Sequence, residues 1–218
     1  MMRRVVFVHT VLSVVSLFAE LARELLPPEV EVWHIVDEML AKVAVAQGGL
    51  SPFIYSRVAD HAQAAREAGA GLVQLTCSSI SPCADAAAAR AGIPVLTVDE
   101  PMADRAIALG THIGVAATAV TALGPTVDQI RKRARAAGRS IEVDPVLCDD
   151  AYVYLTTGDL AAYNDAVRAA IGKMTSNNDV IVLAQGSIAG AVEGMSPAPS
   201  VPVLTSPRLA VERLASYI

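Results

Sequence analysis

The sequence of 218 residues predicts an α/β protein made of two similar halves, each with a four-stranded parallel sheet flanked by helices. Short runs that are apolar throughout alternate with helical segments, a pattern typical of parallel strands that are covered on both faces. Two segments of the first half recur 108 residues later: LTCSSI at 75–80 as LAQGSI at 183–188, and IPVLT at 93–97 as VPVLT at 201–205. The common separation predicts a duplicated unit, with the two copies related by a pseudo-twofold axis.

The helices predicted in the first half begin and end at residues that favour those positions. Ser51 precedes Pro52, which is typical of a helix start because proline lacks an amide hydrogen that the first turn would leave unbonded. Pro27 and Gly92 mark helix ends. The predicted strands are residues 4–9, 30–36, 71–75 and 93–98, and the predicted helices are residues 13–26, 51–69, 81–92 and 101–109.

The second half repeats this alternation, and no low-complexity linker interrupts the chain. We expect the first half to comprise residues 1–98, with a C-terminal helix at 206–218 packing back on it, and the second half to comprise residues 99–205. In the second half, the predicted strands are residues 111–116, 141–147, 179–184 and 201–205, and the predicted helices are residues 125–137, 159–174, 187–193 and 207–217.

Composition excludes several functional classes. With 53% hydrophobic residues, the chain can bury enough surface to fold. A net charge of -5 and 4% aromatic residues argue against nucleic acid as a partner, since that role needs a basic face or a stacking platform. The apolar run after Arg4 imitates a secretory leader, but His9, Thr10 and Ser13 interrupt it and no cleavage motif follows. We therefore expect no membrane partner.

Neither a disulfide framework nor a metal or cofactor motif is recognisable. The three cysteines (Cys77, Cys83 and Cys148) are an odd, sparse set, which predicts a reduced, cytoplasmic protein. No two cysteines or histidines have the spacing of a metal site. Phosphate-binding, dinucleotide-binding and nucleophile-elbow glycine motifs do not occur. The sequence predicts no metal and no cofactor.

The candidate site lies where the predicted strands end, because open parallel sheets bind ligands beyond their carboxyl ends. The repeat pairs Thr10 with Thr118 and Cys77 with Gln185 at these ends. We expect the two pairs to line one pocket between the halves.

Cys77 is the strongest catalytic candidate. It lies in a strand-to-helix turn, TCSSISP, where free amide groups and the helix dipole stabilise a thiolate. The hydroxyls of Thr76, Ser78 and Ser79 would add donors for a carboxylate. The alternative is a small core cysteine, which the polar turn disfavours.

The remaining candidates are weaker. His9 ends the first strand and fits a cleft role and a structural role about equally well. Thr118 and Thr121 fit helix caps, carboxylate donors, or both. Cys83 and Cys148 fit inert core residues better than reactive groups.

These features together resemble the aspartate/glutamate/hydantoin racemase superfamily. The resemblance rests on the paired halves, the TCSS turn, and the segments VDEPMADRAI, GVAATAVTALGPT and PVLTSPRLAVERL, and it covers nearly the whole chain. It implies two flavodoxin-like halves and a cofactor-independent proton transfer next to a carboxylate or carbonyl. Racemases of this superfamily use one cysteine from each half, whereas this chain has Cys77 in the first half and Gln185 at the matching position.

The resemblance implies a cofactor-independent isomerase or racemase-type enzyme that acts on a small carboxylate through a single cysteine, Cys77. One alternative is a one-cysteine decarboxylase or lyase of the arylmalonate decarboxylase type, and another is a non-catalytic carboxylate-binding protein. A homo-oligomer is expected from the apolar content. The expected substrate-binding residues are His9, Thr10, Thr76, Ser78, Ser79, Thr118, Thr121, Gln185, Gly186 and Ser187.

Overall fold

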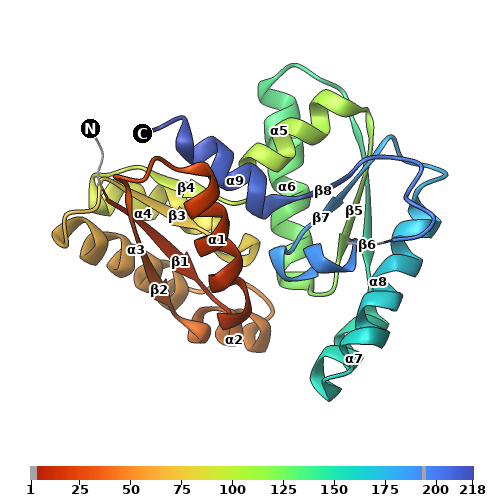
Figure 1. Ribbon diagram of the computed structural model, residues 1–218, viewed down its shortest axis with the longest axis horizontal. Helices are drawn as coiled ribbons and strands as arrows, with labels where there is room; N and C mark the ends of the chain where they lie inside the picture. Colours follow the sequence, from red (N-terminus) through yellow and green to blue (C-terminus); the bar gives the residue numbers. More distant parts are fainter. Residues whose placement is uncertain (1–3, 193–194) are drawn as a thin grey trace. The chain divides into compact units, whose positions relative to one another are not determined.

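The computed structural model describes residues 4–192 and 195–218, which form two compact units (Figure 1). The first unit comprises Met1–Val98 together with Pro207–Ile218, and the second comprises Asp99–Ser206. The chain therefore leaves the first unit after the fourth strand and returns to it for the last helix.

The first unit is built on a parallel sheet with the strand order β2-β1-β3-β4. β1 lies in the middle and pairs with both β2 and β3, so that Val5 is opposite Val32 and Leu72. The strands are β1 (Arg4–His9), β2 (Glu31–Val36), β3 (Leu72–Leu75) and β4 (Val95–Thr97). The helices are η1 (Leu12–Val14), α1 (Val15–Leu25), α2 (Glu38–Gln47), α3 (Pro52–Glu67), η2 (Ser78–Cys83), α4 (Ala84–Ala91) and α9 (Ser206–Ala215).

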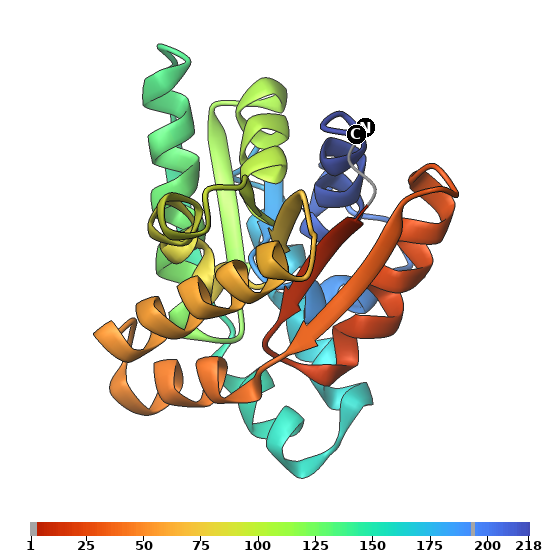
Figure 2. The same cartoon turned by 90° about the vertical axis from the view of Figure 1, so that its left-hand side faces the viewer.

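Helices cover both faces of this sheet (Figure 2). On one face, residues of α2, α3 and α4 pack against Val6, Val8 and Val73. On the other face, α1 packs against Val5 and Phe7, and α9 adds its buried apolar side chains to the same cluster. Two hydrophobic layers on one sheet explain why the strands are apolar throughout instead of alternating with polar residues.

The second unit has the same architecture, with the strand order β6-β5-β7-β8. The fold class predicted from the sequence is therefore confirmed: two parallel sheets of four strands, each flanked by helices. The strands are β5 (His112–Ala117), β6 (Glu142–Leu147), β7 (Val180–Leu183) and β8 (Val203–Thr205). The helices are α5 (Glu100–Leu109), α6 (Val120–Ala136), α7 (Asp149–Thr157), α8 (Leu160–Met174) and η3 (Gly186–Ala191).

The duplication extends to the backbone conformation at the ends of the central strands. Cys77 follows β3 and Gln185 follows β7, and each is the residue immediately before a 3₁₀ helix. Their dihedral angles nearly coincide, with φ −130° and ψ 124° at Cys77 and φ −133° and ψ 131° at Gln185. The two units thus present different side chains from the same local geometry.

Several helix predictions were wrong. The helix predicted to start at Pro125 starts at Val120, because a proline near the start of a helix removes only one backbone bond and the helix continues through it. The helix predicted at 187–193 is the 3₁₀ helix η3, whose described part ends at Ala191; Glu193 lies outside the described residues. The helices α2 and α7 were not predicted from the sequence.

The close approach of Gly110 to Asp179 gives a first stability prediction. A Cβ at Gly110 would lie 2.3 Å from the Asp179 Cβ, so Gly110→Ala must displace that residue. Asp179 accepts hydrogen bonds from the backbone amides of Thr111 and His112, which the displacement would strain. We expect a loss of about 1–3 kcal/mol in urea unfolding. Gly172→Ala, which meets no atom within 4 Å, is the control and should not destabilise; an equal loss in both variants would contradict the steric argument.

Candidate active site

Cys77 is the accessible residue of a buried polar turn in the first unit. Its side chain is partly exposed, whereas Thr76, Ser78 and Ser79 on either side are buried. The Cys77 carbonyl accepts a hydrogen bond from the Ile80 amide, which closes the first turn of η2. The fold therefore orders the turn through its neighbours, and Cys77 is its partly exposed residue.

Behind this turn, a hydrogen-bonded row of side chains links β3 to β1 and β2. The Thr76 hydroxyl donates to the Val8 carbonyl at 3.0 Å and lies 2.9 Å from His9 Nδ1. The other ring nitrogen of His9, Nε2, is 2.9 Å from His34 Nδ1. Both nitrogens of His9 are thus engaged within the unit, and the ring is fully buried. The structure places His9 as a support for Thr76.

Burial sets the charge of this row. Burial, and secondarily the proximity of His34, lowers the pKa of His9 from 6.5 to about 4. Burial also lowers the pKa of His34. Both rings are therefore neutral near pH 7, which suits a chain of hydrogen bonds in which each ring donates through one nitrogen and accepts through the other.

A second polar group at the same sheet edge was not recognised in the sequence. Asp37 follows β2, and its amide donates to the His9 carbonyl. Its buried carboxylate accepts from Arg57 Nε at 2.5 Å and from His61 Nε2 at 2.7 Å. Burial alone would raise the pKa of Asp37, but these two partners lower it below the usual value. The sequence signal was Asp37 immediately before an apolar helical stretch, since its carboxylate also caps α2 by accepting from the Met39 amide.

In the second unit, Gln185 closes the loop that follows β5. Its Oε1 accepts from the Thr118 amide at 2.7 Å, the Ala119 amide at 3.2 Å and the Thr118 hydroxyl at 3.2 Å. Neither Thr118 nor Thr121 is the N-cap residue of α6, because Ala119 occupies that position. Thr118 is buried, and its hydroxyl donates to Gln185 Oε1.

Tyr163 of α8 joins the polar group around Gln185 and was not predicted from the sequence. It is buried, and its hydroxyl lies 3.4 Å from Thr118 Oγ1 and is hydrogen-bonded to Ser187. Burial raises the pKa of Tyr163, so the phenol stays protonated near neutral pH and its O–H group can donate a hydrogen bond. A buried tyrosine needs a partner for its hydroxyl, but the sequence could not indicate which strand end would supply it.

Removing the Tyr163 hydroxyl should destabilise the second unit. Tyr163→Phe leaves the ring in the core and removes the group that joins Thr118 to Ser187, so we expect a stability loss of about 0.5–1.5 kcal/mol in urea unfolding. Tyr217→Phe, at an exposed tyrosine, is the matched control and should change stability little. If Tyr163→Phe is as stable as the unaltered protein, the hydroxyl does not hold Thr118.

The other predicted residues lie at the same strand ends. Thr10 follows β1 and is buried. Thr121 lies in the first turn of α6 and is partly exposed, as is Gly186 at the start of η3, while Ser187 is exposed.

Cys83 is fully buried, and burial raises the pKa of its thiol to about 12, which keeps it protonated. Cys148 is also buried, beside Tyr163.

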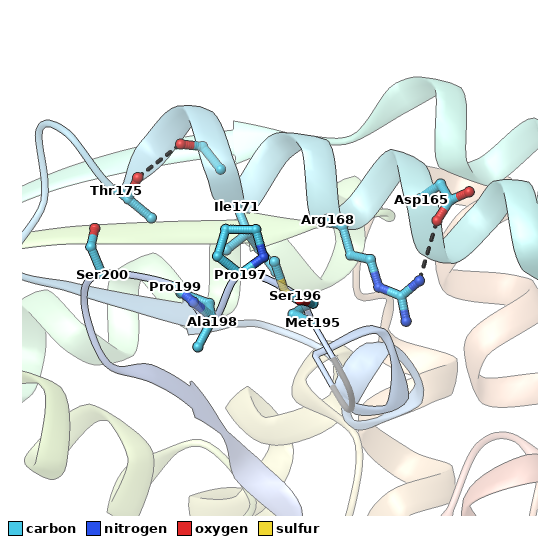
Figure 3. Close-up of a pocket in the computed structure, with 11 residues that line it drawn as sticks. Asp165, Arg168, Ile171, Thr175, Met195, Ser196, Pro197, Ala198, Pro199 and Ser200 are labelled. Atoms are coloured by element: carbon cyan, nitrogen blue, oxygen red, sulfur yellow. Dashed lines mark hydrogen bonds and ion pairs between the residues drawn. The ribbon is translucent and has the colours of Figure 1, made fainter.

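A pocket of about 630 Å³ lies elsewhere in the second unit, between α8 and the loop at 195–200 (Figure 3). Arg168 lines this pocket. Its guanidinium donates to Asp165 Oδ1 at 3.2 Å and to the Ala191 carbonyl at 2.8 Å. None of the predicted site residues lines this pocket. Among the described residues, no group of three or more His, Cys, Asp or Glu side chains could hold a metal ion, and no helix is long and apolar enough to span a bilayer.

Comparison with known proteins places the chain in a family. The model of the Asp/Glu/Hydantoin racemase family matches residues 5–214. The chain belongs to this family. No curated protein sequence matches it significantly. The match spans both units.

Solved structures show the same fold at low identity. A candidate Asp/Glu racemase from Yersinia pestis matches with a TM-score of 0.75 and 15% identity, covering 99% of each chain. Allantoin racemase from Klebsiella pneumoniae matches with a TM-score of 0.63 and 20% identity, covering 98% of this chain and 86% of its own. A glycine-to-cysteine mutant of arylmalonate decarboxylase matches with a TM-score of 0.64 and 18% identity, covering 98% and 93%.

Proposed function

We propose that the protein is a cofactor-independent enzyme that moves a proton at the carbon next to a carboxylate, with Cys77 as its acid or base. The observation that carries this proposal is the contrast at the end of β3. Cys77 is accessible, while the polar residues around it are buried and held in place. A partly exposed cysteine in an ordered polar turn suits chemistry better than packing.

Proton transfer by Cys77 would pass through an enediolate. The Cys77 thiolate takes the proton from the carbon next to the carboxylate, and the C–H electron pair passes into that carboxylate to form an enediolate. Return of a proton from the Cys77 thiol to the same face completes an exchange of the α-proton, and net isomerisation requires the proton to return on the opposite face. Neither step changes an oxidation state, so no redox partner is needed. The developing charge needs fixed donors, and losing one such donor typically costs about 10²–10³-fold in rate. The buried hydroxyls of Ser78 and Ser79 are the candidates in the first unit.

A single-cysteine decarboxylation is the second candidate, and Gln185 favours it. Gln185 occupies the position that matches Cys77 and has no proton to exchange near neutral pH. In a decarboxylation, the carbon–carbon bond to one carboxylate breaks, carbon dioxide leaves, and the electron pair remains in the enediolate. The Cys77 thiol then protonates the carbon, so only one acid is required.

Proton NMR in D₂O tests both candidates. The panel comprises α-amino acids, hydantoins, substituted malonates and maleate, each with the unaltered protein and with Cys77→Ala. Cys77-dependent loss of an α-proton signal supports the isomerase candidate, and deuterium incorporation with release of carbon dioxide supports decarboxylation. If no compound in the panel changes while the fold is intact, the catalytic proposal fails for these substrates and a carboxylate-binding protein becomes the better account.

A further inference from the structure

β2 is the outer strand of its sheet and pairs with β1 alone among the described strands (Figure 2). The Asp37 amide donates to the His9 carbonyl, which sets the alternation of the ladder: odd-numbered residues of this strand bond to β1. The backbone amides and carbonyls of Val32, His34 and Val36 therefore point away from β1, toward the open edge. Such a row of outward backbone groups is a template for a further strand.

The matching strand of the second unit is blocked at this edge. The Cys148 amide donates to the Ala117 carbonyl, so the odd-numbered residues of β6 face outward, and Pro145 is one of them. The strand registers make Pro145 equivalent to His34, since their partners in β5 and β1 are 108 residues apart. Proline has no amide hydrogen to give to an added strand. One copy of the duplicated strand therefore disfavours pairing at a position where the other copy presents an N–H group.

The edge of β2 also lacks the other features that protect sheet edges. Natural edge strands are usually short or carry charged side chains. β4 and β8 have three residues each, whereas β2 has six. From Val32 to Val36 the strand has no Asp, Glu, Lys or Arg, and burial lowers the pKa of His34, so that its ring is neutral near pH 7. Trp33 is 45% exposed and Val36 is 37% exposed.

An apolar pocket of about 350 Å³ lies between β2 and α1. The side chains of Val32 and His34, the residues with outward backbone groups, form one wall. Small and apolar residues of α1, among them Ala19 and Ala22, line the other side. An added strand can therefore form backbone hydrogen bonds with the edge and place alternate side chains in the pocket, which are the two elements of recognition by strand addition.

The charged groups near this edge are balanced within one copy of the chain. Arg4 stacks on the Trp33 ring at 3.9 Å and is paired with Glu31 at 2.6 Å. Arg23 lines the pocket, and Glu20 lies three residues earlier on the exposed face of the same helix. The edge thus has no excess of one sign that would select a strongly acidic or basic peptide, whereas an identical, equally balanced surface can approach it.

We propose that this edge pairs with a second copy of itself, so that two chains join through antiparallel β2 strands into one continuous sheet. A twofold axis at His34 places His34 opposite His34 of the second copy and Val32 opposite Val36, so all the outward backbone groups meet. The same register places Trp33 opposite Ile35, and pairs of aromatic and β-branched residues stabilise neighbouring strands. The edge is therefore complementary to itself. This interface is independent of the chemistry proposed for the strand ends.

A matched pair of variants tests the surface. His34→Ala and His34→Pro both remove the imidazole, but only proline also removes the outward amide hydrogen, as Pro145 does in β6. Sedimentation equilibrium over a concentration series should show the unaltered protein and His34→Ala as dimers of the 22.7 kDa chain. In His34→Pro each copy loses one hydrogen bond between the strands, so the dissociation constant of the dimer should rise at least about tenfold.

Two measurements on the unaltered protein need no variant. Trp33 is the only tryptophan of the chain, so its fluorescence emission should shift to shorter wavelength as the dimer forms. Hydrogen exchange followed by NMR should slow at the amides of Val32, His34 and Val36 when the protein concentration is raised. The amides of Trp33 and Ile35 face β1 and are the internal control, so their exchange should change little.

The results that would overturn the proposal are distinct from loss of folding. Circular dichroism and urea unfolding establish that each variant is folded, and if His34→Pro is not, exchange at the three outward amides decides. A monomer at every concentration would overturn the proposal and leave the edge to a different partner. A dimer in which Trp33 emission and exchange at the outward amides do not respond to concentration would place the interface elsewhere and overturn it as well.

Discussion

Replacing Cys77 with alanine is expected to lower turnover by about 10²–10⁴-fold, the contribution typical of a positioned acid or base. The reason is chemical: alanine has no exchangeable proton, and the hydroxyls beside Cys77 ionise far above neutral pH. Cys77→Ser should be nearly as inactive, because a serine hydroxyl has the size of the thiol but not its acidity. Steady-state rates on any substrate found by the NMR panel measure both variants.

The loss should leave the fold intact. Cys77 is only partly buried at the edge of the core formed by α2, α3 and α4, so removing its sulfur should cost at most about 1 kcal/mol in urea unfolding. Cys83→Ala is the matched control: this thiol is fully buried and protonated, so its removal should lower stability and spare activity. Normal turnover in Cys77→Ala, or equal loss of turnover in both alanine variants, would contradict the role of Cys77.

Acid should destabilise the first unit through His9, by about 3 kcal/mol between pH 6.5 and pH 4. The pKa of His9 is lowered to about 4 in the folded protein and returns to about 6.5 on unfolding. Between these values the unfolded chain binds a proton that the folded chain does not, so the free energy of unfolding decreases as the pH falls. The stabilisation is complete above pH 6.5. His34, whose pKa burial also lowers, adds to the same trend.

Urea unfolding at a series of pH values measures this slope. His9→Gln can still bond to Thr76 but does not titrate, so the slope between pH 4 and 6.5 should flatten. His112→Gln, at an exposed histidine, is the control and should keep the slope. Asp37 acts in a different range: its pKa is lowered, so its contribution is present above the usual aspartate pKa and is lost only as the pH falls below about 4. An unchanged slope in His9→Gln would contradict the assignment to His9.

The fold class could be predicted from the sequence because the hydrophobic pattern of each strand and the spacing of the repeat are local features of the chain. Strands buried on both faces must be apolar throughout, and the spacing of the repeated segments showed that one α/β unit occurs twice. The missed helix α2 also had a local signal: Asp37 caps it, and most residues at 38–47 favour a helix. Its inner face, with Leu40 and Ala44, packs into the core. Pro125 was misplaced because a proline early in a helix resembles a proline at its start.

The sequence by itself determined the family resemblance and the pairing of Cys77 with Gln185 in the repeat, and it predicted the strand ends as the place of the site. It could not determine side-chain partners that lie far apart in the chain. These partners depend on which strands are neighbours and which helix covers them. Examples are the contacts of His9 with Thr76, of Asp37 with Arg57, and of Tyr163 with Thr118. The tertiary structure alone decided that the Gln185 oxygen is occupied, because hydrogen-bond geometry is fixed only when the β5 and β7 ends are brought together by pairing in the sheet.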